Sequence, residues 1–382
     1  MIQRLDSPHA RYYLGDGKAR ELSEMVSERE GNLVIFDEEL SPAQGKNLEE
    51  LMGVRVMDRS ELILDIFATR ARSSEARMQV ELAQLEYLLP RLRRMWNHLS
   101  RIRGGIGLRG PGETQLETDR RLIGTRIGDL KKKLKEVAKA RAVQRRSREG
   151  AFRVALVGYT NAGKSSLLRT LSGAELFVED RLFATLDSAT RKVDLGSGYE
   201  ALVTDTVGFI RKLPHHLVAS FRSTLEEARQ SDVLLHVIDA AHPDWEEQRE
   251  VVLEVLQDLE LEGRDKILVF NKTDRISEDE QKALSERIRA LEPTPSVFVS
   301  AHEPETLEAL RDTLRARVRS RLARVVVSIP VADGEAIATV YREGEVIERS
   351  DESLRVSLTA RVPEGLLGRL HARNGIVIEE VA

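Results

Sequence analysis

The nine residues from Gly158 to Ser166, GYTNAGKSS, match the G-x-x-x-x-G-K-[ST] pattern of a phosphate-binding loop, or P-loop. The apolar run Arg153–Gly158 comes directly before them, and a strand in that place is the context in which this pattern binds phosphate. We expect the backbone N–H groups of the loop and the N-terminal end of the following helix to surround a β-phosphate. Lys164 then supplies a charge to the β- and γ-phosphates, and Ser165 supplies a hydroxyl to Mg²⁺.

A second segment, NKTD from Asn271 to Asp274, matches the guanine-selecting N-K-x-D element and follows another strand-like run. The Asp274 carboxylate can accept two hydrogen bonds from guanine, at N1–H and at the 2-amino group. Adenine lacks that pair of donors and would leave the carboxylate unpaired, which gives strong discrimination. We expect Lys272 along the plane of the base and a backbone N–H of Ser300-Ala301 near O6. The predicted ligand is therefore a guanine nucleotide.

The segment DTVGF predicts the metal and γ-phosphate sensor. Asp205 is expected to reach Mg²⁺ through water, and the N–H of Gly208 is expected to bond the γ-phosphate. In the preceding LFATLD segment, Thr185 is the candidate second hydroxyl ligand. A set with so few protein oxygens suits Mg²⁺, which keeps several of its waters. Loss of the γ-phosphate would then release both segments, as in an order-to-disorder switch.

Phe209 stands where Ras-type enzymes place a glutamine that orients the attacking water. A phenyl ring cannot form that hydrogen bond, so we expect slow intrinsic hydrolysis that another group or a partner completes. His215 and His216 follow closely, and we interpret them as switch packing or solvent-exposed residues rather than as general bases.

The predicted site combines all of these segments. Its metal ligands are Ser165, Thr185 and Asp205 (through water), and its catalytic residues are Lys164, Thr185 and Gly208. The predicted nucleotide contacts are Gly158, Tyr159, Thr160, Asn161, Ala162, Gly163, Lys164, Ser165, Ser166, Phe183, Ala184, Thr185, Leu186, Asp187, Asp205, Thr206, Val207, Gly208, Asn271, Lys272, Thr273, Asp274, Ser300, Ala301 and His302.

Basic residues concentrate in one block of a chain whose formal net charge is only −4. From Arg70 to Glu149 there are 21 Lys and Arg residues against 9 Asp and Glu, a net charge of +12. Such a block can hold a polyanion, because cations near phosphates release condensed counterions. It can equally be a solvated helix surface, and charge alone leaves both interpretations open.

The same block predicts two antiparallel helices that meet along a seam, because its apolar residues alternate spacings of three and four. Pro90 is expected to kink the first helix locally. The linking segment Gly104–Gln115, GGIGLRGPGETQ, is too rich in glycine to continue a helix and predicts a tip. The seam residues are Leu82, Leu85, Leu89, Leu92, Trp96 and Leu99 in the first helix, and Leu116, Ile123, Ile127, Leu130, Leu134 and Val137 in the second.

The fold class predicted for the whole chain is α/β. Residues 1–72 predict a small N-terminal α/β subdomain, and residues 73–149 predict the basic helical hairpin with its glycine-rich tip. Strand-like runs separated by helices predict a three-layer domain with a parallel sheet over residues 150–322. Residues 323–382 predict a small α+β domain with two strands and two helices, to which no chemistry is assigned.

Composition excludes several other classes of protein. Hydrophobic residues make up 41% of the 382 residues, so wholesale disorder is excluded. Cysteine is absent, which excludes disulfides, cysteine-based zinc sites and a thiol nucleophile. No apolar run approaches the roughly 18–20 residues of a membrane span, and the N-terminus lacks the apolar core of a signal peptide. We therefore expect a cytoplasmic protein.

The series FATLD, DTVGF, NKTD and SA resembles the signature of translation-related P-loop GTPases. The segments DRSELILDIFATRA, QVELAQLEYLLPRL, GGIGLRGPGETQLETDRR and FIRKLPHHLV resemble those of the HflX family of ribosome-associated GTPases, and the likeness covers roughly residues 11–302. Family members carry a further strand and helix before the segment that matches YYLGDGK, which starts here at Tyr12. The first sheet is therefore expected to be incomplete, or the start site to be misplaced.

This resemblance implies an Mg²⁺-dependent GTPase that binds the large (50S) ribosomal subunit as a monomer. It implies that the hairpin tip reaches toward the peptidyl-transferase region, and that the protein acts in ribosome splitting, rescue or biogenesis. Arg109 on the tip and Lys131, Lys132 and Lys133 on the second helix become candidates for rRNA backbone contacts, which position without reading sequence. The implied location is cytoplasmic, on ribosomes and peripherally at membranes.

Two other hypotheses belong to different classes. In one, the protein is a nucleotide-sensing adaptor with negligible hydrolysis, and the helical hairpin binds a protein partner. In the other, it is a general NTPase that also uses ATP. Steep salt dependence of subunit binding would favour phosphate contacts over an apolar contact between helix and groove.

Overall fold

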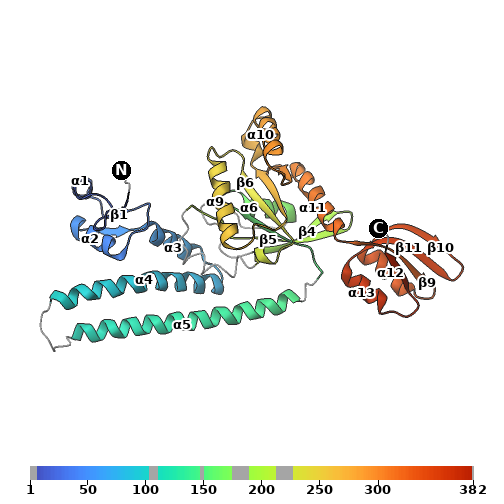
Figure 1. Ribbon diagram of the computed structural model, residues 1–382, viewed down its shortest axis with the longest axis horizontal. Coiled ribbons are helices and arrows are strands. Elements are labelled where there is room, and N and C mark those ends of the chain that lie inside the picture. Colours follow the sequence, from blue (N-terminus) through green and yellow to red (C-terminus); the bar gives the residue numbers. More distant parts are fainter. Residues whose placement is uncertain (1–6, 103–110, 147–149, 174–188, 212–226, 381–382) are drawn as a thin grey trace. The chain divides into compact units, whose positions relative to one another are not determined.

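The structure is a computed structural model, shown in Figure 1, which describes residues 7–102, 111–146, 150–173, 189–211 and 227–380. Within the helices, side chains are not described for residues 92–102, 111–117, 141–142 and 144–146. The chain divides into two compact units. The first comprises residues 1–143, 179–188 and 207–226, and the second comprises residues 144–178, 189–206 and 227–382.

The first unit begins with a small α/β layer. Helices α1 (Asp16–Glu28) and α2 (Pro42–Met52) accompany two short parallel strands, β1 (Leu33–Ile35) and β2 (Arg55–Met57). A capping box starts α2, because the Ser41 hydroxyl accepts the Gln44 N–H and the Gln44 side chain accepts the Ser41 N–H. Leu48 on α2 is fully buried in the apolar cluster of this layer. The expectation of an α/β arrangement here is confirmed.

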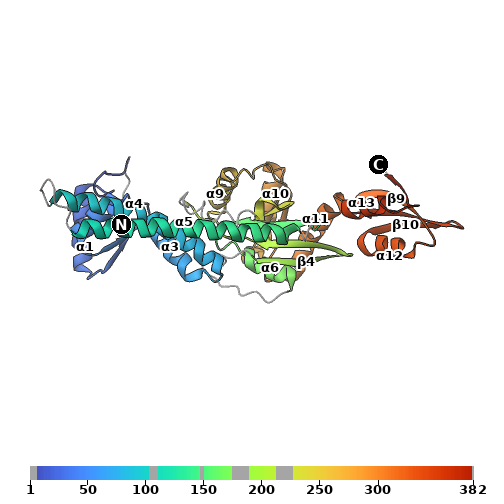
Figure 2. The same cartoon turned by 90° about the horizontal axis from the view of Figure 1, so that it is seen from below.

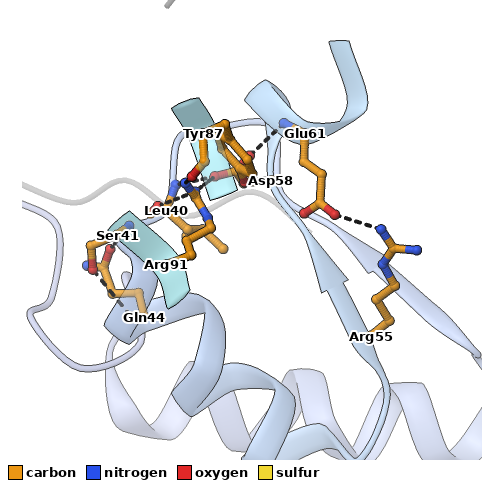
Figure 3. A network of polar contacts seen from close by, with 8 residues as sticks. All are labelled: Leu40, Ser41, Gln44, Arg55, Asp58, Glu61, Tyr87 and Arg91. Atoms are coloured by element: carbon orange, nitrogen blue, oxygen red, sulfur yellow. Dashed lines mark hydrogen bonds and ion pairs between the residues drawn. The ribbon is translucent and has the colours of Figure 1, made fainter. Parts of the chain in front are cut away.

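A buried carboxylate joins this layer to the helices that follow, α3 (Arg59–Arg70) and α4 (Ser74–Ile102), as Figure 3 shows. Asp58 caps α3 by accepting the Glu61 N–H at 2.9 Å, and it accepts the Leu40 N–H at 3.1 Å. The guanidinium of Arg91 on α4 lies over the Tyr87 ring and donates to Asp58 at 2.7 Å. Burial and the Asp58 charge raise the pKa of Tyr87 above its usual range. The first residues of the hairpin are thus fixed to the α/β layer.

Helices α4 and α5 (Pro111–Arg146) run back alongside each other (Figures 1 and 2), which confirms the antiparallel pair. Leu130 is buried at the seam. Arg126 forms a two-pronged ion pair with Glu81 at 2.6 and 2.8 Å, which ties the two helices together across the seam. Helix α4 continues through Pro90.

The predicted tip is longer than the structure allows, because α5 begins at Pro111 and already includes Gly112–Gln115. Proline favours the first position of a helix, where its missing N–H costs no hydrogen bond. The second half of the glycine-rich segment is therefore the first turn of α5.

The second unit contains a six-stranded sheet in the order β4-β5-β3-β6-β7-β8. All neighbouring strands are parallel except β4 and β5, which form an antiparallel hairpin at one edge. The prediction of a parallel sheet is confirmed for the other strands. Strand β4 was not predicted, because its charged residues interrupt the apolar pattern. The strands are β3 (Arg153–Gly158), β4 (Ala189–Gly196), β5 (Tyr199–Asp205), β6 (Val233–Asp239), β7 (Lys266–Asn271) and β8 (Ser296–Phe298).

Helices cover both faces of this sheet, which confirms the three-layer prediction. Helices α6 (Lys164–Ser172) and α11 (Glu308–Ser320) bury Leu167 and Leu310 in one apolar cluster. Helices α9 (Trp245–Asp258) and α10 (Glu278–Leu291) contribute to a second cluster on the other face. The carboxyl ends of the parallel strands therefore meet at one edge, where ligands of such sheets bind.

The C-terminal part of this unit is a four-stranded antiparallel sheet in the order β10-β11-β9-β12. Two helices cover one face of the sheet, so the βαββαβ order is that of a ferredoxin-like domain. Strands β10 and β12 were not predicted. The elements are β9 (Ala323–Pro330), α12 (Gly334–Glu343), β10 (Glu345–Asp351), β11 (Arg355–Val362), α13 (Glu364–His371) and β12 (Val377–Glu380). Among the described residues, no helix is both long and apolar enough to cross a bilayer.

Candidate functional site

The P-loop connects β3 to α6, and two of its glycines are required by close backbone approach. Gly158 has φ +156°, and a Cβ atom there would lie 2.3 Å from the Val237 carbonyl oxygen. Gly163 has φ +92°, and a Cβ atom there would lie 2.2 Å from Nδ2 of Asn271. Both contacts are shorter than any side chain tolerates, so the loop can take this path only with glycine.

Lys164, the first residue of α6, folds back over the loop. Its ammonium donates to the carbonyl oxygens of Gly158 at 3.0 Å and Tyr159 at 2.9 Å. Burial lowers the pKa of Lys164 to about 8, and the nearby charge of Asp205 opposes that shift. A cation with so little solvation favours an anionic partner, which suits a phosphate at this place.

The end of β5 faces the start of α6. The Ser165 hydroxyl donates to the Asp205 carboxylate at 2.5 Å, and both residues are among the predicted metal ligands. The Thr206 hydroxyl donates to the Leu156 carbonyl oxygen at 2.6 Å and fixes the end of this strand against β3. A hydroxyl and a carboxylate held side by side fit the sparse oxygen set that Mg²⁺ takes beside phosphates.

The Asn271 side chain connects the P-loop to the base-recognition segments through hydrogen bonds. Its amide donates to the Ala162 carbonyl oxygen at 2.9 Å, and its carbonyl oxygen accepts the Ala301 N–H at 3.1 Å. Thr170 on α6 donates to the Ala301 carbonyl oxygen at 2.8 Å. Three loops that lie far apart in sequence are therefore held together by one amide side chain and one hydroxyl.

Asp274 and Ser300 are also brought together. The Ser300 hydroxyl donates to the Asp274 carboxylate at 2.6 Å and accepts the His302 N–H at 3.1 Å. Asp274 lies in a short 3₁₀ helix, η1 (Thr273–Arg275), directly after β7. The predicted base-reading carboxylate is thus anchored to the predicted O6 loop.

Three residues near this site were missed by the sequence reasoning. Thr170 and Thr306 hold the Ser300-Ala301 loop, since the Thr306 hydroxyl accepts the Ser300 N–H at 2.9 Å. Asp239 forms an ion pair with Lys272 at 2.7 Å. The signal for Asp239 was its place at the end of the strand-like run DVLLHVIDA, at the same sheet edge as the other functional residues.

The sensor segment passes from the second unit into the first between Thr206 and Val207. Val207 and Phe209 are buried at 7% and 2% exposure. Val207 belongs to the apolar cluster of α3 and α4, with Ile210 packed against the cluster. Arg59 at the start of α3 donates to the Arg211 carbonyl oxygen at 2.9 Å. The segment that follows the sensor is therefore part of the core of the first unit.

Several predicted site residues lie outside the described residues. They are Phe183, Ala184, Thr185, Leu186 and Asp187 in the nucleotide and metal predictions, Arg109 in the rRNA prediction, and His215 and His216. Within the described part of the chain, no group of three or more His, Cys, Asp or Glu side chains could hold a metal ion.

The lysine run on α5 does not act as one group. Lys131 is paired with Glu86 of α4 at 2.8 Å, and the charge of Lys133 acts on Glu81, whose pKa is lowered chiefly by its hydrogen bond to Arg126. Lys132 points away from the seam, because successive residues of an α-helix turn by about 100°.

Three further cations share the outward face of Lys132. We call this set the α5 basic stripe: Arg121, Lys132, Lys135 and Lys139. All four are exposed, and none forms an ion pair with any of the side chains that the structure describes. Gly128 lies within the stripe with open space around it. The stripe extends over about 27 Å of helix, at 1.5 Å per residue.

Models of known families match three consecutive parts of the chain. Residues 1–68 match the N-terminal region of a GTP-binding GTPase, and residues 70–148 match the middle region of a GTP-binding GTPase. Residues 153–272, which hold the P-loop and Asn271, match a 50S ribosome-binding GTPase.

Relatives with similar sequences extend over nearly the whole chain. A GTPase HflX of Magnetococcus marinus is 46% identical, with 96% of this chain and 85% of the relative covered. A GTPase HflX of Escherichia coli is 45% identical, with 94% and 84% covered. Among solved structures, a GTP-binding protein from the archaeon Sulfolobus solfataricus in complex with GDP is 26% identical, with 83% of this chain and 89% of that chain covered and a TM-score of 0.44.

Proposed function

The chain belongs to the HflX family of GTPases, and from that premise we propose that it couples GTP hydrolysis to binding and release of the large ribosomal subunit. Binding and hydrolysis of GTP follow from the family. The proposal extends this activity to splitting or rescue of ribosomes. The observation that carries the nucleotide part of the proposal is Asn271, which joins the P-loop to the loop expected at guanine O6. The ribosome part rests on the match of residues 153–272 to a 50S ribosome-binding GTPase.

In the proposed site, Lys164 and the backbone N–H groups of the P-loop hold the β- and γ-phosphates. The Asp274 carboxylate reads N1–H and the 2-amino group, held in place by the Ser300 hydroxyl. The predicted contacts in all segments, including Thr185, keep the roles given to them above. ATP would leave the Asp274 carboxylate without its two donors, so ATP is expected to bind far more weakly.

Ser165 and Asp205 are the described residues that would hold Mg²⁺, Ser165 directly and Asp205 through water, with Thr185 as a further ligand. Their fit rests on the 2.5 Å contact between the Ser165 hydroxyl and the Asp205 carboxylate. The bound ion would neutralise charge on the phosphates. The protein itself positions the phosphates through the P-loop and orders Asp205 through the neighbouring Thr206 anchor.

Hydrolysis by the protein alone is proposed to be slow. Phe209 is buried, and its ring offers no hydrogen bond to an attacking water. The group that orients the water would then come from another part of the chain or from the ribosome.

The α5 basic stripe is the proposed contact with rRNA phosphates, together with Arg109 on the tip. Of the lysine run, Lys132 is the strongest candidate, since Lys131 and Lys133 already have carboxylates beside them. We also propose a division of the chain into four parts at residues 72, 149 and 322, a monomeric state and a cytoplasmic location.

Turnover of GTP with and without purified large subunits tests this function. We expect hydrolysis by the full chain to rise by at least about tenfold with subunits present, because a group that a partner supplies to stabilise the transition-state charge can be worth about 10³–10⁵ in rate. Equal rates with and without subunits would contradict the coupling. A protein that binds subunits with no hydrolysis at all would support the adaptor hypothesis instead.

A further inference from the structure

Strand β6 ends at a carboxylate that none of the sequence motifs includes. Oδ2 of Asp239 lies 2.7 Å from Nζ of Lys272, and each side chain is only 12% exposed. The other carboxylate oxygen, Oδ1, accepts the Ala241 N–H at 3.1 Å. The Asp239 carboxylate is thus held by a hydrogen bond within its own loop as well as by the ion pair with Lys272.

The backbone holds the two partners in register. Asp239 and Asn271 are paired residues of the parallel strands β6 and β7, and the Ala240 N–H donates to the Asn271 carbonyl oxygen at 2.9 Å. Lys272 follows Asn271 directly, so the ion pair closes a short connection between neighbouring strand ends. The ion pair therefore links the end of β6 to the first residues of the guanine-selecting segment.

Lys272 itself is strongly constrained. Its φ is +65°, in the left-handed region that few residues other than glycine adopt. Its stem lies near the P-loop, because a Cβ atom on Gly163 would be 3.9 Å from Cε of Lys272. A free lysine side chain loses rotamer entropy when it is ordered. The ion pair fixes that side chain before any ligand arrives.

We propose that Asp239 is a positioning residue for the guanine nucleotide, acting through Lys272. It holds the lysine stem extended beside the P-loop, where the flat face of a purine can lie on it. This inference rests on the proposed nucleotide site and adds a residue to it. Because Asp274 reads the edge of the base and has a separate anchor in Ser300, Asp239 contributes to the affinity for the nucleotide and leaves the choice of base unchanged.

The dissociation constants of GDP and inosine diphosphate, measured by calorimetry on the full chain with Mg²⁺ present, test this role. Asp239→Ala is expected to weaken GDP binding about tenfold, and Asp239→Asn about threefold, because the amide keeps a hydrogen bond but loses the charge. The ratio of the two dissociation constants stays within about twofold of wild type, since inosine lacks only the 2-amino group that Asp274 reads.

A double-mutant cycle separates positioning from a general structural role. In a Lys272→Met background, Asp239→Ala is expected to change GDP affinity by less than about twofold, since the residue it acts through is gone. Asp265→Ala is the matched control, because Asp265 forms an ion pair with Arg317 at 3.2 Å in the same unit and has no contact with the site. Asp265→Ala should leave GDP affinity unchanged.

Three results would overturn the proposal. They are unchanged GDP affinity in Asp239→Ala, an equal loss in the Lys272→Met background, and a changed ratio of GDP to inosine diphosphate. If Asp239→Ala fails to fold, Asp239→Asn and the cycle built on it give the same decision. Failure of the proposed nucleotide site is a distinct result, because the wild-type chain would then give no binding heat with GDP.

Discussion

Gly163 shows how strictly single residues determine the nucleotide site. It combines a positive φ with a near collision between any added Cβ and the Asn271 amide. That amide is also the joint that connects the P-loop to Ala301. A side chain at position 163 would therefore strain the backbone and also displace the Asn271 amide.

We expect Gly163→Ala to lower the free energy of unfolding by about 1–3 kcal/mol and to abolish measurable GDP binding. Gly198→Ala is the matched control, because Gly198 has φ +80° but nothing within 4 Å of an added Cβ. The control should show a loss of stability from backbone strain alone and keep GDP affinity. Urea unfolding and calorimetry measure the two effects, and normal GDP binding by Gly163→Ala would contradict this account of the loop.

His236 on β6 predicts a dependence of stability on pH. It is fully buried, and neither ring nitrogen has a hydrogen-bond partner among the described residues. Burial lowers the pKa of His236 to about 3, with Arg249, Lys266 and Lys164 adding to the shift. As pH falls, the His236 imidazole takes up a proton in the unfolded chain before it does so in the folded chain. The free energy of unfolding is therefore unaffected by His236 above about pH 6.5 and decreases from there toward pH 3.

The expected slope from this residue is at most about 1.4 kcal/mol per pH unit in that window. His236→Leu should flatten the profile of unfolding free energy against pH, measured by urea titration between pH 7 and pH 4. His371→Gln, a change of an exposed histidine, should keep the wild-type slope. A His236→Leu profile that falls as steeply as wild type would rule out this source of acid sensitivity.

At the scale of residues, sequence predicted the segments that the fold brings together: the P-loop, the NKTD segment and the Ser300-Ala301 loop. The P-loop and NKTD have fixed spacings because each phosphate or base atom needs a group at a set position. The anchors Thr170, Thr306 and Asp239 belong to no such pattern. The two threonine hydroxyls find their partners only when the fold brings distant loops together, so their roles could not be predicted. The place of Asp239 at a strand end was a signal in the sequence, but its pairing with Lys272 depends on the fold.

At the scale of elements, the attachment of α4 depends on a buried charge. The Asp58 carboxylate is 2% exposed, and Arg91 is its only charged partner among the described residues. Arg91 also donates to the Leu40 carbonyl oxygen at 3.0 Å, so it bridges the α/β layer and the hairpin. Removing one member of such a pair leaves an uncompensated charge behind.

Arg91→Met should therefore lower the free energy of unfolding by about 2–4 kcal/mol, since Asp58 loses its cation and keeps two backbone N–H donors and the Tyr87 hydroxyl. Adding Asp58→Asn should recover part of that loss, because asparagine can still cap α3 without a charge. Denaturant unfolding of the two single variants and the double variant measures the coupling. If the changes in the free energy of unfolding of the two single variants simply add in the double variant, the ion pair does not connect the α/β layer to α4.

The α5 basic stripe makes a prediction about salt. Removing one cation that neutralises an rRNA phosphate should lower the slope of log affinity against log salt concentration by about one. The triple variant Lys132→Ala, Lys135→Ala and Lys139→Ala should thus bind large subunits more weakly and with a slope smaller by about three. Lys131→Ala, which removes a lysine already paired with Glu86, should change the slope little. If Lys131→Ala lowered this slope as much as the triple variant does, the proposal that the α5 basic stripe contacts rRNA would be contradicted.

Prediction of elements from sequence succeeded where apolar patterns were strong. The strands of the parallel sheet and the seam of the hairpin were found because burial on two faces or on one stripe leaves a clear period. Strands β4, β10 and β12 were missed, and each lies at a sheet edge. Edge strands keep charged residues that discourage pairing with other chains, and these residues erase the apolar signal.

At the scale of the whole molecule, charge is unevenly divided along the chain. The block that contains the hairpin has a net charge of +12, whereas the rest of the chain has a net charge of −16. The separation favours contact between the basic block and a polyanion while the acidic remainder limits nonspecific binding. This division could be predicted from sequence. The assignment of Val207–Arg211 to the first unit could not, because it depends on the packing of Val207 against α3 and α4.

The affinity of the full chain for purified large ribosomal subunits, measured with a non-hydrolysable GTP analogue and with GDP at one salt concentration, tests the central proposal most directly. We predict at least about tenfold tighter binding with the analogue, a coupling of about 1.4 kcal/mol between the nucleotide site and the subunit. Equal affinity in the two nucleotide states would contradict the account.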